Sequence, residues 1–368
     1  MIDRRHLFKV LRLADIPALR DRRRFAALRR TFHARLWKAA AARAGAACST
    51  LDFGFQRISR NGLDILVRGG ELRLDDRLTL ELMGNKLLTF RLLAELGCDV
   101  PRHARFSFSN MEPALALMAA TGRPIVVKPL SGSGGGAGVT TGIATRRDLQ
   151  RAAFAALGND CELLAEEQLE GGCYRLLYFD GALIDAIRRE PPRLTGDGRT
   201  RLARLAAKET DRRLTAIPAI AMNPLHLDRE ARHYLRVQGL SRRSVLPAGE
   251  TVLVKRAINQ NGRHENHIVS TIHAGTVSRC GEICSRLGVR LAGVDIIARD
   301  ITLPLEPENG LIGEINTTPA LHHHELVAED RPFGEVTALL LDRMFAARAG
   351  VVVRAEPAPT RRRMEAVS

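Results

Sequence analysis

The feature that most constrains this chain is the segment 124–139, in which a short apolar run ends at a lysine and leads into a glycine-rich loop. An Ile-Val-Val run precedes Lys128, and five glycines occupy positions 132–138. Because glycine lacks a Cβ, such a loop lets backbone N–H groups approach phosphate oxygens closely, and a neighbouring lysine can neutralise their charge. The segment predicts a strand followed by a loop that holds a polyphosphate.

A plain turn would explain the same loop, since glycine-rich connections after strands are common. The loop is not a Walker A motif, because its lysine precedes the glycines and no Gly-Lys-Ser/Thr follows. A phosphate-binding function therefore depends on which other residues the fold brings beside the loop.

Three oxygen-bearing side chains lie far downstream in two apolar runs. Asp295 interrupts the run 294–298, where an unpaired carboxylate would be costly and a metal ion is a natural partner. Glu314 and Asn316 are two residues apart, so on a strand they face the same side, which could also be simply a solvated side. On two neighbouring strands the three residues present the oxygen ligands that Mg²⁺ prefers, with Mn²⁺ as an alternative. With the loop, they indicate ATP-dependent chemistry.

Five stretches in this order carry a family resemblance. They are 84–101, which opens with Gly-Asn-Lys; 124–139; 163–177, which contains Glu-Glu-Gln-Leu; 189–198, with Arg-Glu-Pro and Thr-Gly-Asp-Gly; and Asp295 with the Glu-Ile-Asn at 314–316. Together they resemble the ATP-grasp superfamily, and within it the ATP-grasp portion of cyanophycin synthetases, with a more distant likeness to D-alanine–D-alanine and glutathione-type ligases. The likeness covers roughly residues 79–345.

The resemblance implies an α/β (α+β) ATP-grasp fold, in which two α/β subdomains grip ATP. The expected regions are a basic helical N-terminal region with short strands at 1–78, an ATP-grasp domain at 79–345 with a lid at about 104–167 and a larger sheet at 168–345, and a loose C-terminal tail at 346–368. The domain would open with a helix at 80–96 that Thr79 caps and Gly97 ends. No second phosphate loop follows in the sequence, so we expect a free-standing relative without a Mur-ligase-like domain.

The lysines of this chain support a phosphate site. Only six of its 56 basic residues are lysines, so the chain almost always uses arginine. Two of the six, Lys86 and Lys128, stand where the family places phosphate-contacting lysines. A lysine ammonium is a compact charge on a flexible stem, which the planar fork of arginine does not replace.

The resemblance also implies a role for each remaining site residue. The nucleotide would contact Lys86, Lys128, Ser131, Gly132, Ser133, Gly134, Gly135, Gly136, Gly138, Glu166, Glu167 and Leu169, with the backbone at 166–169 holding adenine. Asp295, Glu314 and Asn316 would hold one or two Mg²⁺ ions. Arg189, Arg175 and Arg256 are candidates to stabilise the transferring phosphate or a tetrahedral oxyanion. In so arginine-rich a chain, each of these three could equally be structural.

The activity implied is that of an ATP-dependent carboxylate–amine ligase, which forms an amide through an acyl phosphate and releases ADP and phosphate. Its partners would be a small carboxylate and an amine, such as amino acids or peptides. One alternative is a degenerate ATP-binding protein with a regulatory or scaffolding role, suggested by Cys173 where some relatives carry an acid for the ribose; Glu170 could substitute for it. Another is a polyanion-binding module that uses residues 1–50.

The N-terminal fifty residues carry thirteen Lys/Arg against three Asp, within a chain whose net charge is +15. Apolar residues there recur at helical spacing, among them Phe25, Phe32 and Leu36. We expect this face to pack on the protein itself or on a second subunit, with an acidic partner, a membrane or nucleic acid as alternatives. Nucleic acid is the least expected, because no recognised motif is present.

The remaining composition is that of a cytoplasmic enzyme. The six cysteines are scattered without zinc-ligand spacing, and no run of eighteen apolar residues could span a membrane. The charged N-terminus lacks the apolar core of a signal peptide. Many relatives form dimers or tetramers, so a homo-oligomer stays open.

Overall fold

The computed structural model describes residues 16–131 and 136–353. Its strands are β1 (Ala47–Thr50), β2 (Phe55–Arg60), β3 (Leu63–Arg68), β4 (His103–Ser107), β5 (Ile125–Pro129), β6 (Thr140–Ile143), β7 (Glu162–Glu167), β8 (Gly172–Phe179), β9 (Ala182–Arg189), β10 (Arg193–Thr195), β11 (Thr251–Leu253), β12 (Asn266–Ile268), β13 (Leu291–Ala298), β14 (Gly310–Thr317) and β15 (Val351–Val353). Its helices are α2 (Ile16–Arg43), α3 (Arg77–Gly84), α4 (Lys86–Glu95), α5 (Glu112–Thr121), α6 (Arg146–Ala156), α7 (Leu202–Thr215), α8 (Arg229–Val237), α9 (Ala274–Arg286), α10 (His322–Glu325) and α11 (Glu335–Ala346).

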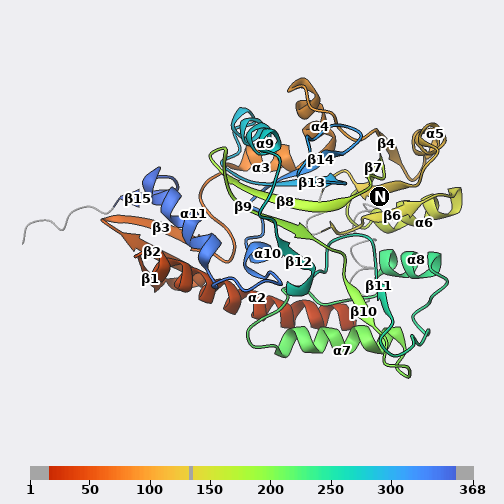
Figure 1. The fold of residues 1–368 in the computed structure, drawn as a ribbon, viewed down its shortest axis with the longest axis horizontal. Coiled ribbons are helices and arrows are strands. Elements are labelled where there is room, and N and C mark those ends of the chain that lie inside the picture. Colours follow the sequence, from red (N-terminus) through yellow and green to blue (C-terminus); the bar gives the residue numbers. More distant parts are fainter. Residues whose placement is uncertain (1–15, 132–135, 354–368) are drawn as a thin grey trace, which may run out of the picture.

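These strands form four antiparallel sheets. The largest has five strands in the order β12-β9-β8-β13-β14, and a four-stranded sheet in the order β4-β7-β5-β6 belongs to the lid. A second four-stranded sheet has the order β1-β2-β3-β15, and β10 pairs with β11. Figure 1 shows α3 and α9 above the five-stranded sheet, the lid at one end of it, and α2 along the opposite side of the molecule.

Helix α2 forms because its apolar residues recur at helical spacing and find a core. Phe25, Phe32, Leu36 and Trp37 are all buried, and the Trp37 indole donates a hydrogen bond of 2.7 Å to the Gly69 carbonyl. The helix packs with α11 on the β1-β2-β3-β15 sheet. The apolar face of this basic segment therefore lies against the rest of the chain.

The C-terminal region differs from the expectation of a loose tail that begins at residue 346. Val351, Val352 and Val353 form β15, which pairs with β3 so that Val351 lies opposite Ile65. Three consecutive β-branched residues favour extended backbone, and the open edge of β3 supplies the hydrogen-bond partners. Residues 354–368 lie outside the described part.

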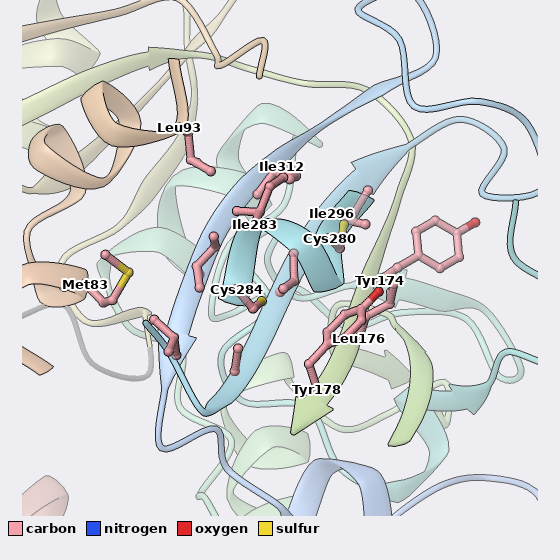
Figure 2. Packing of buried hydrophobic residues seen from close by; sticks show 14 of the residues in the cluster. Met83, Leu93, Tyr174, Leu176, Tyr178, Cys280, Ile283, Cys284, Ile296 and Ile312 are labelled. Atoms are coloured by element: carbon pink, nitrogen blue, oxygen red, sulfur yellow. The ribbon is translucent and has the colours of Figure 1, made fainter. Parts of the chain in front are cut away.

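The core of the five-stranded sheet determines which side chains reach the opposite face. Cys280, Ile283 and Cys284 of α9 pack against Ile296 of β13 and Ile312 of β14 (Figure 2). Since side chains alternate along a strand, burial of Ile296 on this face turns Asp295 to the other.

An irregularity in the β13–β14 ladder sets the orientation of Glu314. Ile312 and Ile315 both lie in the core although they are three residues apart, which strict alternation does not allow. The pairing shifts between Asp295↔Glu314 and Ile296↔Ile312, so Gly313 is an extra residue. This β-bulge leaves Glu314 opposite Asp295 on the face away from α9.

The lid is a separate α/β layer with its own core. Ile125 and Val127 of β5 are buried against Leu149 and Ala153 of α6. Their intervening neighbours, Val126 and Lys128, therefore face the other way, toward the five-stranded sheet. Strands β4 to β7 run from His103 to Glu167, and the expected lid boundaries of 104–167 stay a prediction.

The helix expected at 80–96 is wrong as a single element, because the chain forms two helices there. Asp76 caps α3 by accepting a 2.8 Å hydrogen bond from the Thr79 amide, so Thr79 is not the cap. Asn85 has an extended backbone and caps α4 by accepting a hydrogen bond of 3.1 Å from the Leu88 amide. Asp and Asn are strong N-caps, and the break places Lys86 at the first position of α4.

A smaller unit follows the five-stranded sheet's first hairpin. Helices α7 and α8 and the β10–β11 ribbon share a core that includes Leu202, Leu235 and Leu246. Within the described ranges, no helix combines the length and the apolar character needed to cross a membrane.

Candidate functional site

A cavity of about 820 Å³ lies between the lid and the face of the five-stranded sheet that is turned away from α9. Most residues expected to bind nucleotide, metal or substrate line it: Lys86, Lys128, Gly136, Glu166, Glu167, Leu169, Arg175, Arg189, Arg256, Asp295, Glu314 and Asn316. They come from segments more than two hundred residues apart in sequence, so the fold itself brings them together.

Two of the residues expected in the glycine loop, Ser131 and Gly138, are not among the described residues that line this cavity. Ser131 lies outside the cavity lining, and its hydroxyl donates a 2.6 Å hydrogen bond to the Asp160 carboxylate. Gly138 packs on Pro129, where a Cβ would come within 2.9 Å of the proline ring. Gly132, Ser133, Gly134 and Gly135 lie outside the described residues, so their predicted contacts stay predictions.

Lys128 is held at the cavity wall by a carboxylate. It lies on β5 and Glu166 on the adjacent strand β7, and the lysine Nζ is 2.5 Å from Glu166 Oε1. Both side chains are largely buried, at 13 % and 7 % exposed, so solvent screens this pair little. The Glu166 side chain is thus engaged with the lysine, which leaves backbone groups as the part of the hinge available to a base.

Neighbouring hinge side chains are also committed to protein contacts. Glu167 accepts hydrogen bonds from the Arg102 amide at 2.8 Å and from its Nε at 3.0 Å. The Gln168 side chain accepts a hydrogen bond of 2.7 Å from the Gly142 amide of the lid. Leu169 lines the cavity and offers an apolar wall.

Lys86 reaches the same cavity from α4, which lies beside the strand that carries Lys128. The Lys86 amide donates a 3.4 Å hydrogen bond to the Leu130 carbonyl just beyond β5, and Lys128 Nζ lies 5.7 Å from the centroid of the Phe90 ring on α4. Lys86 Nζ is 3.6 Å from Glu314 Oε1, and its side chain is 9 % exposed. Both expected phosphate-contacting lysines therefore line the cavity, from adjoining parts of the lid and of α4.

Asp295 is paired with an arginine. Arg175 on β8 lies opposite it across the β8–β13 ladder, and donates Nε to Oδ1 at 2.6 Å and Nη2 to Oδ2 at 2.5 Å. Burial alone would raise the pKa of Asp295, but the charge and hydrogen bonds of Arg175 outweigh it and hold that pKa below its ordinary value. Asp295 is thus an ionised carboxylate inside the protein.

The donor chemistry around Asp295 fits Mg²⁺. Asn316 donates a 3.3 Å hydrogen bond to Asp295, and the Glu314 carboxylate remains 37 % exposed toward the cavity. All three offer oxygen, which suits a hard cation. Across the described ranges no three His, Cys, Asp or Glu side chains gather as metal ligands, so a metal here relies on two carboxylates and one amide. Glu314 is the least engaged of them.

Arg189 is a buried cation that faces the cavity. Its Nη2 donates to the Ile258 carbonyl at 3.3 Å and lies 3.5 Å from Asn261 and from His323 Nε2. Its Nε is buried without a hydrogen-bond partner among the residues that the structure describes. Burial, and then the charge of Arg175, lower the pKa of Arg189 to about 10. A cation so poorly compensated suits an anionic ligand.

Arg256 differs from the other two arginines. It is exposed at the cavity rim, directly after a fully buried lysine, Lys255. No ion pair of Arg256 is present in the described part of the chain. It is therefore free to meet a substrate.

Sequence reasoning missed the segment that closes over the lid. The Nζ of Lys255 contacts Asp228 at 2.5 Å and Asn259 Oδ1 at 3.1 Å, and Asn259 Nδ2 donates 3.0 Å to the Gly136 carbonyl. The rarity of lysine could have drawn attention to Lys255, because it is one of only six lysines in the chain. Nothing in its sequence neighbourhood indicates the contact with the glycine loop.

The two residues weighed for the ribose lie in different places. Cys173 lines the cavity, and burial, followed by the charge of Asp295, raises the pKa of its thiol to about 11. Glu170 forms a 3.1 Å ion pair with Arg299 and is not among the described residues that line the cavity. Glu170 therefore does not replace an acid at position 173.

His322 and His323 form the start of α10 and line the cavity, with their ring centroids 4.2 Å apart. Burial, and then the charge of His33, lower the pKa of His322 to about 3, so this imidazole is neutral at physiological pH. His324 turns away and contacts Asp185 at 2.6 Å.

Curated proteins similar in sequence to this chain include ligases and biosynthetic enzymes. The cyanophycin synthetase of Trichormus variabilis is 28 % identical over 271 residues, which is 73 % of this chain and 30 % of that protein. A bifunctional glutathione biosynthesis protein of Mannheimia succiniciproducens is 28 % identical over 258 residues, 66 % of this chain and 33 % of that one. The chain thus spans about a third of the length of these relatives. No family model matches it.

A solved structure shows the same fold. The crystal structure of a bifunctional glutathione synthetase from Pasteurella multocida superposes with a TM-score of 0.51 at 24 % identity, over 82 % of this chain and 42 % of that one. The expected α/β ATP-grasp fold is confirmed. The resemblance of the chain to the ATP-grasp superfamily, and within it to cyanophycin synthetases, is confirmed by these relatives and by the fold.

Proposed function

We propose that the protein is an ATP-dependent ligase that joins a carboxylate to an amine. One observation carries this proposal: a single cavity brings together Lys128 of the lid, Lys86 of α4 and the oxygen donors of Asp295, Glu314 and Asn316. Such an arrangement suits a triphosphate with its cation. Its relatives, named as cyanophycin synthetases and as glutathione biosynthesis proteins, support the same class of reaction.

The chain's own residues would bind and orient the nucleotide. The backbone at 166–169 would hold the base, and Leu169 would cover it. Lys128 and Lys86 would grip the phosphates, with Gly136 closing from the lid. Glu314, Asn316 and Asp295 would hold Mg²⁺, which supplies charge neutralisation of the phosphate oxygens.

The reaction proceeds in two steps. A carboxylate oxygen of the first substrate attacks the γ-phosphorus, the bond to the bridging oxygen of ADP breaks, and an acyl phosphate forms. The amine then attacks the acyl carbon, loses a proton, and phosphate leaves with the bond to that carbon broken. Arg189 would stabilise the negative charge that develops, because its buried Nε lacks a partner among the described residues. Catalysis is mainly positioning and charge neutralisation.

The substrates proposed are small, such as amino acids or peptides. The cavity continues past the phosphate region toward Arg188, Glu190, Arg193 and Arg256, so a substrate with a carboxylate of its own would find cations there. A cytoplasmic location and a homo-oligomeric assembly stay predictions.

Release of phosphate from ATP and Mg²⁺ across a panel of amino-acid and dipeptide pairs tests this function. We expect release that needs both a carboxylate and an amine and that Lys128→Ala abolishes. An intact protein that binds no ATP would overturn the proposal.

A further inference from the structure

A second hollow, of about 550 Å³, lies where the lid meets α8, outside the cavity described above. It is lined by five arginines, Arg147 and Arg151 from α6 of the lid and Arg229, Arg232 and Arg236 from α8. None of its lining residues lines the ATP-grasp cavity. Figure 1 shows the two helices facing one another at this end of the molecule.

The positive charge of this hollow is largely uncompensated. Asp148 is its single acidic lining residue. Arg147 has no ion-pair partner among the residues with described positions, and Arg232 donates its Nε to a backbone carbonyl, that of Asp228. Arg229 lies over the Phe154 ring, 5.1 Å from the centroid. A concave surface lined by one sign of charge concentrates the potential and attracts ions of the other sign.

The one carboxylate present shows what an anion does at this place. Asp148 belongs to the lid, and its Oδ1 lies 2.8 Å from Arg236 and 3.8 Å from His233, both on α8, and 3.6 Å from Arg151 on its own helix. It thus neutralises cations from both sides of the joint. The remaining three arginines of the hollow, Arg147, Arg229 and Arg232, have no ion pair with a carboxylate among the described residues.

Hydrogen bonds link α8 at this joint to the lid strand β6. Glu230 of α8 accepts a 2.8 Å hydrogen bond from the Thr141 hydroxyl on β6, and His233 lies 3.3 Å from the Gly142 carbonyl. Both lid residues follow the glycine loop directly. A ligand that holds α6 on α8 would therefore restrain the strand that carries the loop.

We propose that the hollow between α6 and α8 binds a small multivalent oxyanion, phosphate-type or polycarboxylate, which bridges the arginines of the lid and of α8. Arginine suits such a ligand, because its guanidinium donates two parallel hydrogen bonds to a phosphate or carboxylate. The site is separate from the proposed nucleotide site, and binding requires no turnover.

Calorimetric titration of the full chain with inorganic pyrophosphate tests the site. We expect Arg147→Gln combined with Arg232→Gln to weaken binding by about tenfold or more, because two charged donors are lost. The matched control is Arg77→Gln with Arg91→Gln, which removes the same charge from exposed arginines on α3 and α4. Equal affinity in both double variants would overturn the proposal, as would a loss of binding that follows Lys128→Met instead.

Citrate in a parallel titration separates the two ligand types. If Arg147→Gln with Arg232→Gln weakens the binding of pyrophosphate but not of citrate, the hollow is a phosphate-type site. If it weakens the binding of citrate but not of pyrophosphate, the hollow is a polycarboxylate site. If it weakens the binding of neither ligand, the proposal is contradicted.

Hydrogen exchange of the Thr141 and Gly142 amides tests the bridging. In the nucleotide-free protein, pyrophosphate should slow the hydrogen exchange of both amides. It should not slow that exchange in the variant that combines Arg147→Gln with Arg232→Gln. Binding without slower exchange would overturn the bridging of lid and α8. Because neither readout uses ATP, a negative result here is distinguishable from a failure of the ligase proposal.

Discussion

Arg175 and Asp295 form a two-pronged ion pair between adjacent strands, with both carboxylate oxygens within 2.6 Å of guanidinium nitrogens. Both side chains are buried, at 9 % and 14 % exposed. Arg175 therefore holds in place a carboxylate that the resemblance assigns to metal binding. This pair, with the further charge of Arg189, makes an ionised Asp295 tolerable inside the protein.

Removing the arginine alone should destabilise the fold more than removing both charges. Arg175→Met leaves a buried carboxylate unpaired, and we expect a loss of about 3–5 kcal/mol in the free energy of unfolding. Arg175→Met with Asp295→Asn should lose clearly less, because no unpaired buried carboxylate remains. Urea unfolding of the two variants and the wild type measures the difference. Equal losses would show that the ion pair is not what keeps Asp295 ionised.

The same pair predicts a dependence of stability on pH. The folded-state pKa of Asp295 lies below its unfolded value, so its contribution is fully present above the unfolded pKa of about 3.9 and is lost as the pH falls through the folded pKa. The stability difference between wild type and Asp295→Asn should therefore shrink on acidification below about pH 4. Urea unfolding at a series of pH values checks this; a difference that stays constant down to acid pH would contradict it.

Lys128 should contribute to nucleotide affinity far more than a lysine on the surface does. We expect Lys128→Met to weaken binding of a non-hydrolysable ATP analogue by roughly 10- to 100-fold, the range for a lost hydrogen bond to a charged group. The control is Lys208→Met, since Lys208 is 55 % exposed and pairs with Asp197. Fluorescence or calorimetric titration measures both. Similar affinities in the two variants would remove Lys128 from the site.

Gly136 should tolerate no side chain. Its φ is +70°, and a Cβ would lie 2.8 Å from the Cβ of Asn259. Gly136→Ala should push the loop away from Asn259 and weaken nucleotide binding at least several-fold, with a small change in melting temperature. Gly84→Ala is the matched control, because no atom lies within 4 Å of its added Cβ and α3 already reaches this residue. Equal nucleotide affinity in the two variants would contradict the close approach.

The fold and the placing of Lys128, Glu314 and Asn316 at one site could be predicted from the sequence, because the alternation of side chains along a strand and the order of the five motifs are visible in it. It could not supply relationships that depend on packing between distant strands. The pairing of Arg175 with Asp295 arises from the β8–β13 register. The orientation of Glu314 depends on the bulge at Gly313; a glycine inside a strand is a signal of a bulge, but the register around it depends on the neighbouring strand.

Local errors have equally physical causes. Thr79 satisfies a capping pattern, but Asp76 and Asn85 are stronger caps and divide the segment into two helices. In that case the stronger caps decided where the helices begin. The Ser131 hydroxyl donates a hydrogen bond to Asp160, and its expected contact with the nucleotide stays a prediction.

In the proposed reaction, a carboxylate is activated as an acyl phosphate. Mass spectrometry of the products formed from a carboxylate substrate labelled with ¹⁸O in both oxygens tests this step. We expect one ¹⁸O of each reacting carboxylate to appear in the released inorganic phosphate and none to appear in ADP. Label in AMP, or phosphate release without ¹⁸O, would contradict it.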